Sequence, residues 1–386
     1  MASTPGVWMA KTDGHWWRGV VQGPSFNTVA VPFIYGTTRP DTTNTGLAVN
    51  GLTTADLTVA GTPDLTINDA YVTAHGSTLD KLWVKGHINF TASSPVTITN
   101  SQIEGRAFTG TAPYDAIVHA RSTSTPVSAT LSFTNCVIKA VQPDVGICTA
   151  MGERLGHFDR CDLSLGSDII DFWWTTGDSG TKSIRGCYLH DFSFWANDPK
   201  HTNDSVHPGW SHSDAIQMSG GDNILIEGNN IQHFAASGVG DYATLVGTGN
   251  YTNGAYGGCV MITPSGYTVT NLNIKNNWIH GGEGQIHLAV QSGGSYNSGN
   301  TMTCTGNRHG VDAHAAGPYS GNYNHIFYVW DNGMTSQAPT DVVSGAVYDT
   351  TPDVPAALRG TPLPAVQYIS GATEYQSIYQ TSTPYA

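Results

Sequence analysis

Charged residues are scarce in this chain, and most of those present are acidic. Asp, Glu, Lys and Arg make up 12% of the 386 residues, whereas globular proteins average about 25%. There are 16 Lys and Arg against 29 Asp and Glu, which gives a formal net charge of −13. A nucleic-acid-binding protein needs a basic stripe that neutralises phosphates. We therefore expect no nucleic-acid partner, and the same charge disfavours an anionic membrane surface.

The sequence also lacks cysteine motifs, long apolar runs and a secretion signal, and each absence argues against one class of protein. The six cysteines include no Cys-x-x-Cys pair and no Cys/His spacing typical of zinc, so we predict no disulfide framework and no metal or other cofactor. No apolar run approaches the ~20 residues that cross a bilayer, so we expect no membrane insertion. The first residues, 1–6, lack the basic and apolar regions of a secretion signal.

The sequence does contain a repeat. One eight-residue phrase of alternating apolar and polar residues, broken by a corner of Asn, Arg or Gly, occurs seven times. The shortest corner-to-corner intervals, 135 to 160 and 160 to 186, are 25 and 26 residues and set the length of a bare turn. A second short apolar motif recurs at 115–118, 145–148, 168–171, 214–217 and 284–287, with 258–261 in the same column. The seven copies of the phrase are Val96–Ile103, Leu131–Ile138, Gly156–Leu163, Lys182–Leu189, Ile224–Ile231, Leu272–Ile279 and Met302–His309.

This period indicates an all-β fold, a parallel β-helix. Strands this short do not bury themselves and need a copy of the same unit above and below. A β-sandwich is the alternative, but a sandwich has no reason to repeat one phrase seven times. Cys136, Cys161 and Cys187 occupy one position in three successive copies, where the other copies carry Ser or Asn. We interpret them as a stacked ladder of free side chains. The residues expected to form one internal file are Ile98, Phe133, Phe158, Ile184, Ile226 and Ile274.

The repeat also predicts the domain organisation. Residues 1–40 precede it and are expected to form a short N-terminal attachment or capping segment. Residues 41–335 are expected to form the β-helix. Residues 336–386 are rich in Pro, Thr and Tyr without a clear repeat, which fits an extended C-terminal tail.

Two long insertions interrupt the repeat and are the best candidates for a binding region. Residues 191–212 and 234–256 both lead into the strand motif that carries Gln217 or its neighbours, so we expect them to wall one groove. Sugar binding needs flat aromatic faces together with hydrogen-bonding groups. The alternative is that the aromatic residues only cover hydrophobic surface under long loops. The side chains proposed to contact substrate are Trp173, Trp174, Trp195, His207, Trp210, His212, Gln217 and His287.

Alternation along the second motif predicts which of its residues face outward. The residues after the buried Ile are Val118, Cys148, Asp171, Gln217 and His287, with Met261 expected in the same file. Asp115, Asp168 and Asp214 fall near the corner, where capping backbone amides is the simpler role. His190, His233 and His280 recur as an expected structural corner column.

Glycoside hydrolysis needs two carboxylates roughly 5 to 9.5 Å apart. Asp171 with Asp214, or with Glu283, is the candidate catalytic pair. A lyase needs a base and a neutraliser for a uronate, such as Ca²⁺ or Arg. No basic groove is visible in the sequence, so a neutral glycan is the better expected ligand. A His/Asp metal site within 198–214 is the less favoured alternative to a polar loop that holds itself together.

Several of these segments resemble right-handed parallel β-helix proteins of actinobacteria and their tailed phages, some of which are minor tail or tailspike proteins. The segments are TTRPDTTNTG (37–46), VTITNSQIEG (96–105), HSDAIQ (212–217), ILIEGNNI (224–231) and LNIKNNWIHGG (272–282). The resemblance covers residues 36–335. It implies a right-handed β-helix at a virion's tail tip, homotrimeric, in contact with other tail proteins and with host cell-surface polysaccharide. A virion protein released by lysis needs no secretion signal.

Two functions follow from the resemblance and the candidate residues. The first is a structural virion protein that recognises host glycan without cleaving it. The second is a polysaccharide depolymerase, a hydrolase or lyase, with carboxylates near Asp171 and Asp214. The sequence leaves both open.

Overall fold

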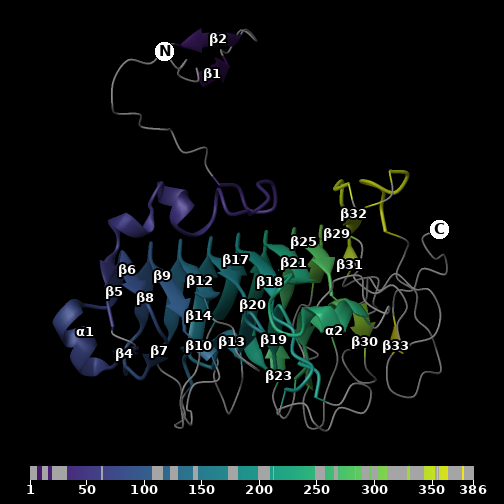
Figure 1. Ribbon diagram of the computed structural model, residues 1–386. Coiled ribbons are helices and arrows are strands. Elements are labelled where there is room, and N and C mark those ends of the chain that lie inside the picture. The colour runs from purple at the N-terminus through teal and green to yellow at the C-terminus, as the bar shows by residue number, and fades with distance from the viewer. Residues whose placement is uncertain are drawn as a thin grey trace. The chain divides into compact units, whose positions relative to one another are not determined.

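The computed structural model divides the chain into two units, Met1–Ile34 and Tyr35–Ala386, shown in Figure 1. In the first unit, strand β1 (Val7–Ala10) pairs antiparallel with β2 (Trp16–Gly19). The structure describes residues 7–10, 16–19, 33–61, 64–106, 116–121, 129–141, 147–172, 181–198, 209–211, 213–247, 257–264, 268–282, 284–288, 295–296, 303–310, 328–330, 343–352, 354, 356–363 and 376–377.

The second unit is a parallel β-helix built from three stacked sheets, which we number I to III in the order in which each coil passes through them. Sheet I contains β3 (Thr58–Val59), β6 (Leu82–Val84), β9 (Gln102–Gly105), β12 (Val137–Ala140), β15 (Asp162–Ser164), β18 (Tyr188–Phe192), β21 (Asn230–Ala235), β25 (Trp278–Gly281), β29 (Arg308–His309) and β32 (Val347–Tyr348).

Sheet II follows sheet I within each coil. It contains β4 (Leu65–Ile67), β7 (Ile88–Phe90), β10 (Ala116–His119), β13 (Cys148–Met151), β16 (Ile170–Phe172), β19 (Ile216–Met218), β22 (Gly258–Ile262), β26 (Gly284–Leu288) and β30 (Tyr328–Trp330), with β33 (Gln376–Ser377) added antiparallel.

Sheet III completes each coil. It contains β5 (Thr78–Asp80), β8 (Val96–Thr99), β11 (Leu131–Thr134), β14 (Leu155–Asp159), β17 (Thr181–Arg185), β20 (Gly221–Glu227), β24 (Asn273–Lys275), β28 (Thr303–Thr305) and β31 (Val343–Ser344), with β23 (Thr268–Thr270) and β27 (Ser295–Tyr296) paired beside this path.

Helices in the described parts of the chain are few and short. They are the 3₁₀ turns η1 (Gly46–Asn50) and η2 (Thr54–Asp56) and the helices α1 (Asp69–His75) and α2 (Tyr242–Gly247). Asn68 caps α1 by accepting a hydrogen bond from the Tyr71 amide at 2.9 Å. Among the described residues, no helix has the length and apolar character required to span a bilayer.

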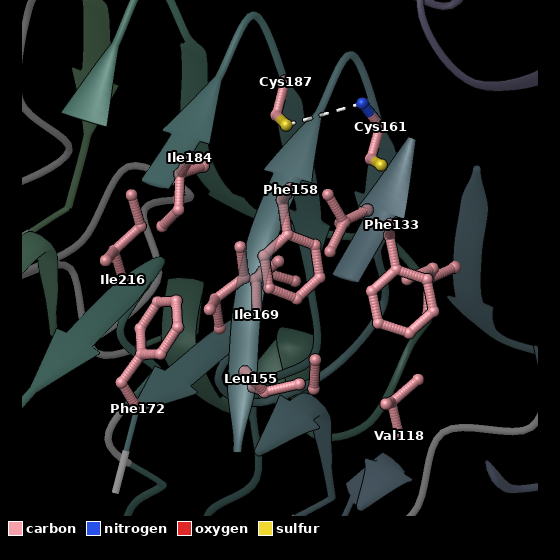
Figure 2. Packing of buried hydrophobic residues seen from close by; sticks show 14 of the residues in the cluster. Val118, Phe133, Leu155, Phe158, Cys161, Ile169, Phe172, Ile184, Cys187 and Ile216 are labelled. Carbon is pink, nitrogen blue, oxygen red and sulfur yellow. Dashed lines mark hydrogen bonds between the residues drawn. The ribbon is translucent and has the colours of Figure 1, made fainter. Parts of the chain in front are cut away.

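The predicted internal file is confirmed. Phe133 pairs in register with Ile98 on one side and Phe158 on the other, and the file continues through Ile184, Ile226 and Ile274 to Cys304. Phe133 and Phe158 stack with ring centroids 5.3 Å apart, and Phe172 of sheet II meets Phe158 edge-on at 6.3 Å (Figure 2). Because each coil supplies side chains to one shared interior, strands of three to five residues bury their apolar faces completely.

The corner between sheets III and I carries the predicted ladder. Its corner residues have positive φ, from 49° at Asn100 to 65° at Gly228, a backbone region that favours Asn and Gly. The next residue of each coil points inward. Asn277 accepts hydrogen bonds from the Asn229 amide at 2.9 Å and donates to the Ile226 carbonyl at 3.0 Å. The six cysteines are free and buried, and the Cys161 amide lies 3.4 Å from the Cys187 sulfur (Figure 2).

The stack extends beyond the boundary predicted at residue 335. Strands β31 and β32 add to sheets III and I, and Tyr348 and Val354 form a small buried cluster with Leu358 and Leu363. This coil carries the phrase in a degenerate form, Val343–Tyr348, with Gly345 at the corner (φ 62°) and buried Ala346 after it. The sequence analysis did not recognise this copy. At the other end, the first strand of the stack is β3, and residues 35–57 precede it.

Candidate functional site

The outward file of sheet II is the surface on which the candidate residues meet. Asp171 pairs in register with Gln217, Gln217 with Met261, and Met261 with His287. The alignment of these four residues is as predicted. Stacked strands lie about 4.8 Å apart, so neighbouring members of the file are close enough to contact one ligand.

The register removes two predicted residues from this file. Val118 pairs with Ile88 and Ala150 and belongs to the buried interior. Cys148 pairs with Ala116 and packs with Met151 in a small cluster separate from that interior. The outward residues in these coils are His119 and Met151, and Met151 pairs with Asp171. The prediction aligned Ile117 and Ile147 with the inward Ile of later coils. In the structure, that inward position holds Val118 and the small Ala150.

The side chains of this file are buried in its first coils and half-buried in its later coils. His119, Met151 and Asp171 are 9%, 6% and 3% exposed, whereas Gln217, Met261 and His287 are half-buried. Burial lowers the pKa of His287 to about 4, so its imidazole is neutral at pH 7. The half-buried part of the file therefore starts at Gln217, and within it the Nε2 atom of His287 is buried.

Asp168 and Asp214 have the capping role that the sequence favoured. The Asp214 amide donates to the Asp168 carboxylate at 2.8 Å, and the Gly258 amide donates to the Asp214 carboxylate at 2.6 Å. The Asp214 side chain is 2% exposed. Each carboxylate thus holds the corner of the next coil, which leaves Asp214 poorly suited to proton transfer with a bound sugar. Asp115 and Glu283 lie outside the described residues.

Both long insertions connect sheet I to sheet II, so they stand at the same corner of the stack. Their described parts pack against each other. The Ala196 amide donates to Asp241 at 2.8 Å, and the Asp241 amide donates to the Phe194 carbonyl at 2.8 Å. Trp210 meets Phe194 edge-on at 5.0 Å within a small apolar cluster that also includes Tyr242. For Trp210, covering hydrophobic surface is therefore an observed role.

Trp195, in the first insertion, has a buried polar group that is not satisfied by the described residues. Its ring is half-buried, and its indole N–H has no hydrogen-bond partner in the described part of the chain. Its backbone is fixed by Ser211, whose hydroxyl accepts from the Trp195 amide at 3.0 Å. The other proposed substrate-contacting residues, Trp173, Trp174, His207 and His212, lie outside the described residues.

The expected histidine column is not a single file. His190, Gln232 and His280 are in register on the outside of sheet I, whereas His233 pairs with Gly281 and is fully buried. His190 lies between Asp162 at 2.9 Å and Asp191 at 2.7 Å. Although burial opposes the charge, these two carboxylates raise the pKa of His190 to about 9.

Sheet III presents a second exposed surface that the sequence reasoning did not single out. Charges near its corner are paired, because Glu227 contacts Arg185 at 3.1 Å and Lys275 at 3.2 Å. The signal in the sequence was a polar residue three positions before the corner in six of the seven phrases, with Leu225 as the exception. The file in the middle of the sheet is half-buried or exposed and consists of Thr97, Ser132, His157, Ser183, Leu225, Asn273 and Thr303.

Within the described residues, no three His, Cys, Asp or Glu side chains converge as a metal site requires. Comparisons with protein-family models, curated proteins and solved structures gave no match for this chain. The geometry of sheet II and its insertions is therefore the basis of the functional proposal.

Proposed function

We propose that this protein is a phage tail protein of the minor tail or tailspike kind that binds a host cell-surface glycan along sheet II without cleaving it. The observation that carries the proposal is the half-buried file of Gln217, Met261 and His287 in three consecutive coils. An amide, a thioether and a neutral imidazole at regular spacing suit a ligand that is itself a chain of similar polar units.

Two further features support a neutral glycan. The packed insertions lead into sheet II and carry the half-buried Trp195, whose ring suits stacking on a sugar. The net charge of −13 disfavours a polyanionic ligand. The virion location, the homotrimer and attachment to other tail proteins through the N-terminal segment rest on the sequence resemblance and belong to this proposal.

A depolymerase is the second candidate. It is favoured by one observation, the placement of the Asp171 carboxylate directly beside Gln217 in the file. A buried carboxylic acid is a suitable general acid when burial favours its neutral form. Against this role, Asp171 is only 3% exposed and the Asp214 carboxylate caps backbone.

Binding to purified actinobacterial cell-wall polysaccharide tests the proposal. We expect Gln217→Ala and His287→Ala each to weaken binding roughly 5- to 10-fold, as the loss of one hydrogen bond implies. Ser183→Ala, on the outside of sheet III, is the matched control and should bind like the wild type. Equal binding by all four proteins would refute the proposed surface.

The same incubation separates the two candidates. Assay of reducing ends and of unsaturated sugars should detect no product if the protein only binds. Product that accumulates with the wild type and disappears with Asp171→Asn would establish the depolymerase instead.

A further inference from the structure

One segment of the β-helix contacts coils far apart in the stack. We call residues Tyr35–Asn50 the strap; they precede the first coil and lie along the outside of sheet I and its corner with sheet III (Figure 1, purple). In a solenoid each coil otherwise contacts only its neighbours, so coils at the two ends are not coupled directly. The strap provides such a coupling.

Its contacts run along most of the stack. The strap's Gly36 carbonyl accepts from Arg308 at 3.0 Å, and its Pro40 carbonyl accepts from Asn230 at 2.7 Å. Further along, the Gly46 amide donates to the Arg160 carbonyl at 2.8 Å, and Asn50 donates to Asn100 at 2.6 Å. The strap therefore touches coils from that of β9 to that of β29.

The strap is seated without space for larger residues. Gly36 has φ +75°, and a Cβ there would lie 2.5 Å from Asn276 Cβ. Gly46 has φ +56°, and a Cβ there would lie 2.7 Å from Val137 Cγ2. The Tyr35 hydroxyl donates to Asp159, and the Tyr35 ring lies 4.1 Å from the Arg185 guanidinium. This fit indicates one defined docked position.

The contact that reaches the last described coil is an ionic one. Arg39 binds the Asp349 carboxylate at 3.0 Å, and His280 contacts the same oxygen at 2.7 Å. Asp349 and His280 are each 3% exposed. Asp349 also holds its own coil, since its amide donates to the His309 carbonyl at 2.8 Å. Arg39 and Asp349 are 310 residues apart, so this contact forms only after the coils between them have been synthesised.

We propose that the strap is a clamp that couples the last coils to the earlier ones, so that the C-terminal end of the stack does not open independently. The clamp is complete when Arg39 forms its ion pair with Asp349. The clamp is independent of glycan binding, because it lies on sheet I and not on sheet II.

Hydrogen exchange on the full-length protein tests the clamp. The amides to follow are those of Arg308, Gly310 and Asp349, each bonded to the coil below. Because Arg39 makes a charge-assisted hydrogen bond to the nearly buried Asp349 carboxylate, we expect Arg39→Ala to speed their exchange roughly 10-fold or more, with Val96–Thr99 unchanged. Unchanged exchange at the three amides, or equal acceleration in every coil, would overturn the proposal.

Two further variants make the test specific. Arg106→Ala removes a comparable ion pair, at 2.8 Å to Asp64, outside the strap, and should leave the three amides unaffected. Gly46→Val lifts the strap near β12, far along the stack from Asp349. If the strap acts as one clamp, Gly46→Val also accelerates exchange at Asp349, and its effect is not additive with that of Arg39→Ala. An effect of Gly46→Val limited to the coils around Val137 would refute the coupling.

Discussion

Two neutral histidines inside the stack predict that the protein loses stability in mild acid. His233 and His309 are both 0% exposed. Burial lowers the pKa of each to about 3, against an ordinary value of 6.5. His233 is held by the Ser213 carbonyl, and His309 lies 2.7 Å from the Gln285 side chain. Between about pH 6.5 and pH 3 both imidazoles therefore stay neutral in the folded state, whereas the same histidines of the unfolded chain are protonated.

The magnitude follows from proton linkage. Below pH 6.5 the unfolded state takes up a proton at each histidine that the folded state does not, so the free energy of unfolding falls with pH. One pKa unit corresponds to about 1.36 kcal/mol, which gives a loss of about 2.5 kcal/mol per histidine between pH 7 and pH 4.5. The two together amount to about 5 kcal/mol, a large share of the stability of a typical domain.

Urea unfolding at several pH values between 7 and 4.5 measures this loss. We expect His233→Gln, whose amide can still donate to Ser213, to remove about a third of the pH dependence, and His233→Gln with His309→Gln to remove about two-thirds of it. His287, whose pKa burial lowers to about 4, contributes the remainder. His75→Gln, at an exposed position of α1, is the control and should retain the wild-type dependence. An unfolding free energy that is the same at pH 7 and pH 4.5, or a double variant as acid-sensitive as the wild type, would refute the reasoning.

Three other perturbations have defined outcomes. Asn277→Ala removes a buried side chain that bridges three coils and should lower the free energy of unfolding by roughly 3 kcal/mol in urea titration, since buried partners lose their hydrogen bonds; an effect under 1 kcal/mol would contradict the ladder. Phe158→Ala opens a cavity at a 0% exposed position and should lower the free energy of unfolding by about 3 to 5 kcal/mol. Ser183→Ala, on the outer face, should change the free energy of unfolding little. Protonated His190, whose pKa is raised to about 9, stabilises the fold fully below pH 6.5, and this contribution is lost as the pH rises through 9. The free energy of unfolding of the wild type should therefore be roughly 2 kcal/mol lower at pH 9.5 than at pH 7, after a discount for solvent screening at the exposed Asp191. The difference should be much smaller in His190→Gln.

The periodic features of the fold were predictable because a solenoid repeats the same local choice in every coil. Alternation within the phrase identified the internal file from Ile98 to Ile274, which the register confirms. The corner residues could be identified because only Asn, Gly and a few others tolerate positive φ. The cysteine and asparagine ladder followed from their shared position in each copy.

The candidate site was predictable only in part. Asp171, Gln217 and His287 share the predicted file, yet the sequence did not reveal that Asp171 is 3% exposed or that Asp214 is committed to the Gly258 amide. Burial of an outward residue depends on the loops that pass over it, and no pattern within the strand records those loops.

The sequence by itself determined the coil, its interior and its corners, because these depend on residues a few positions apart and are repeated along the chain. Only the tertiary structure decided the register of β10 and β13 and the path of the strap from Asn100 to Asp349. Each of these rests on contacts between residues distant in sequence that occur once. A contact that occurs once leaves no periodic signal, so three-dimensional packing alone determines it.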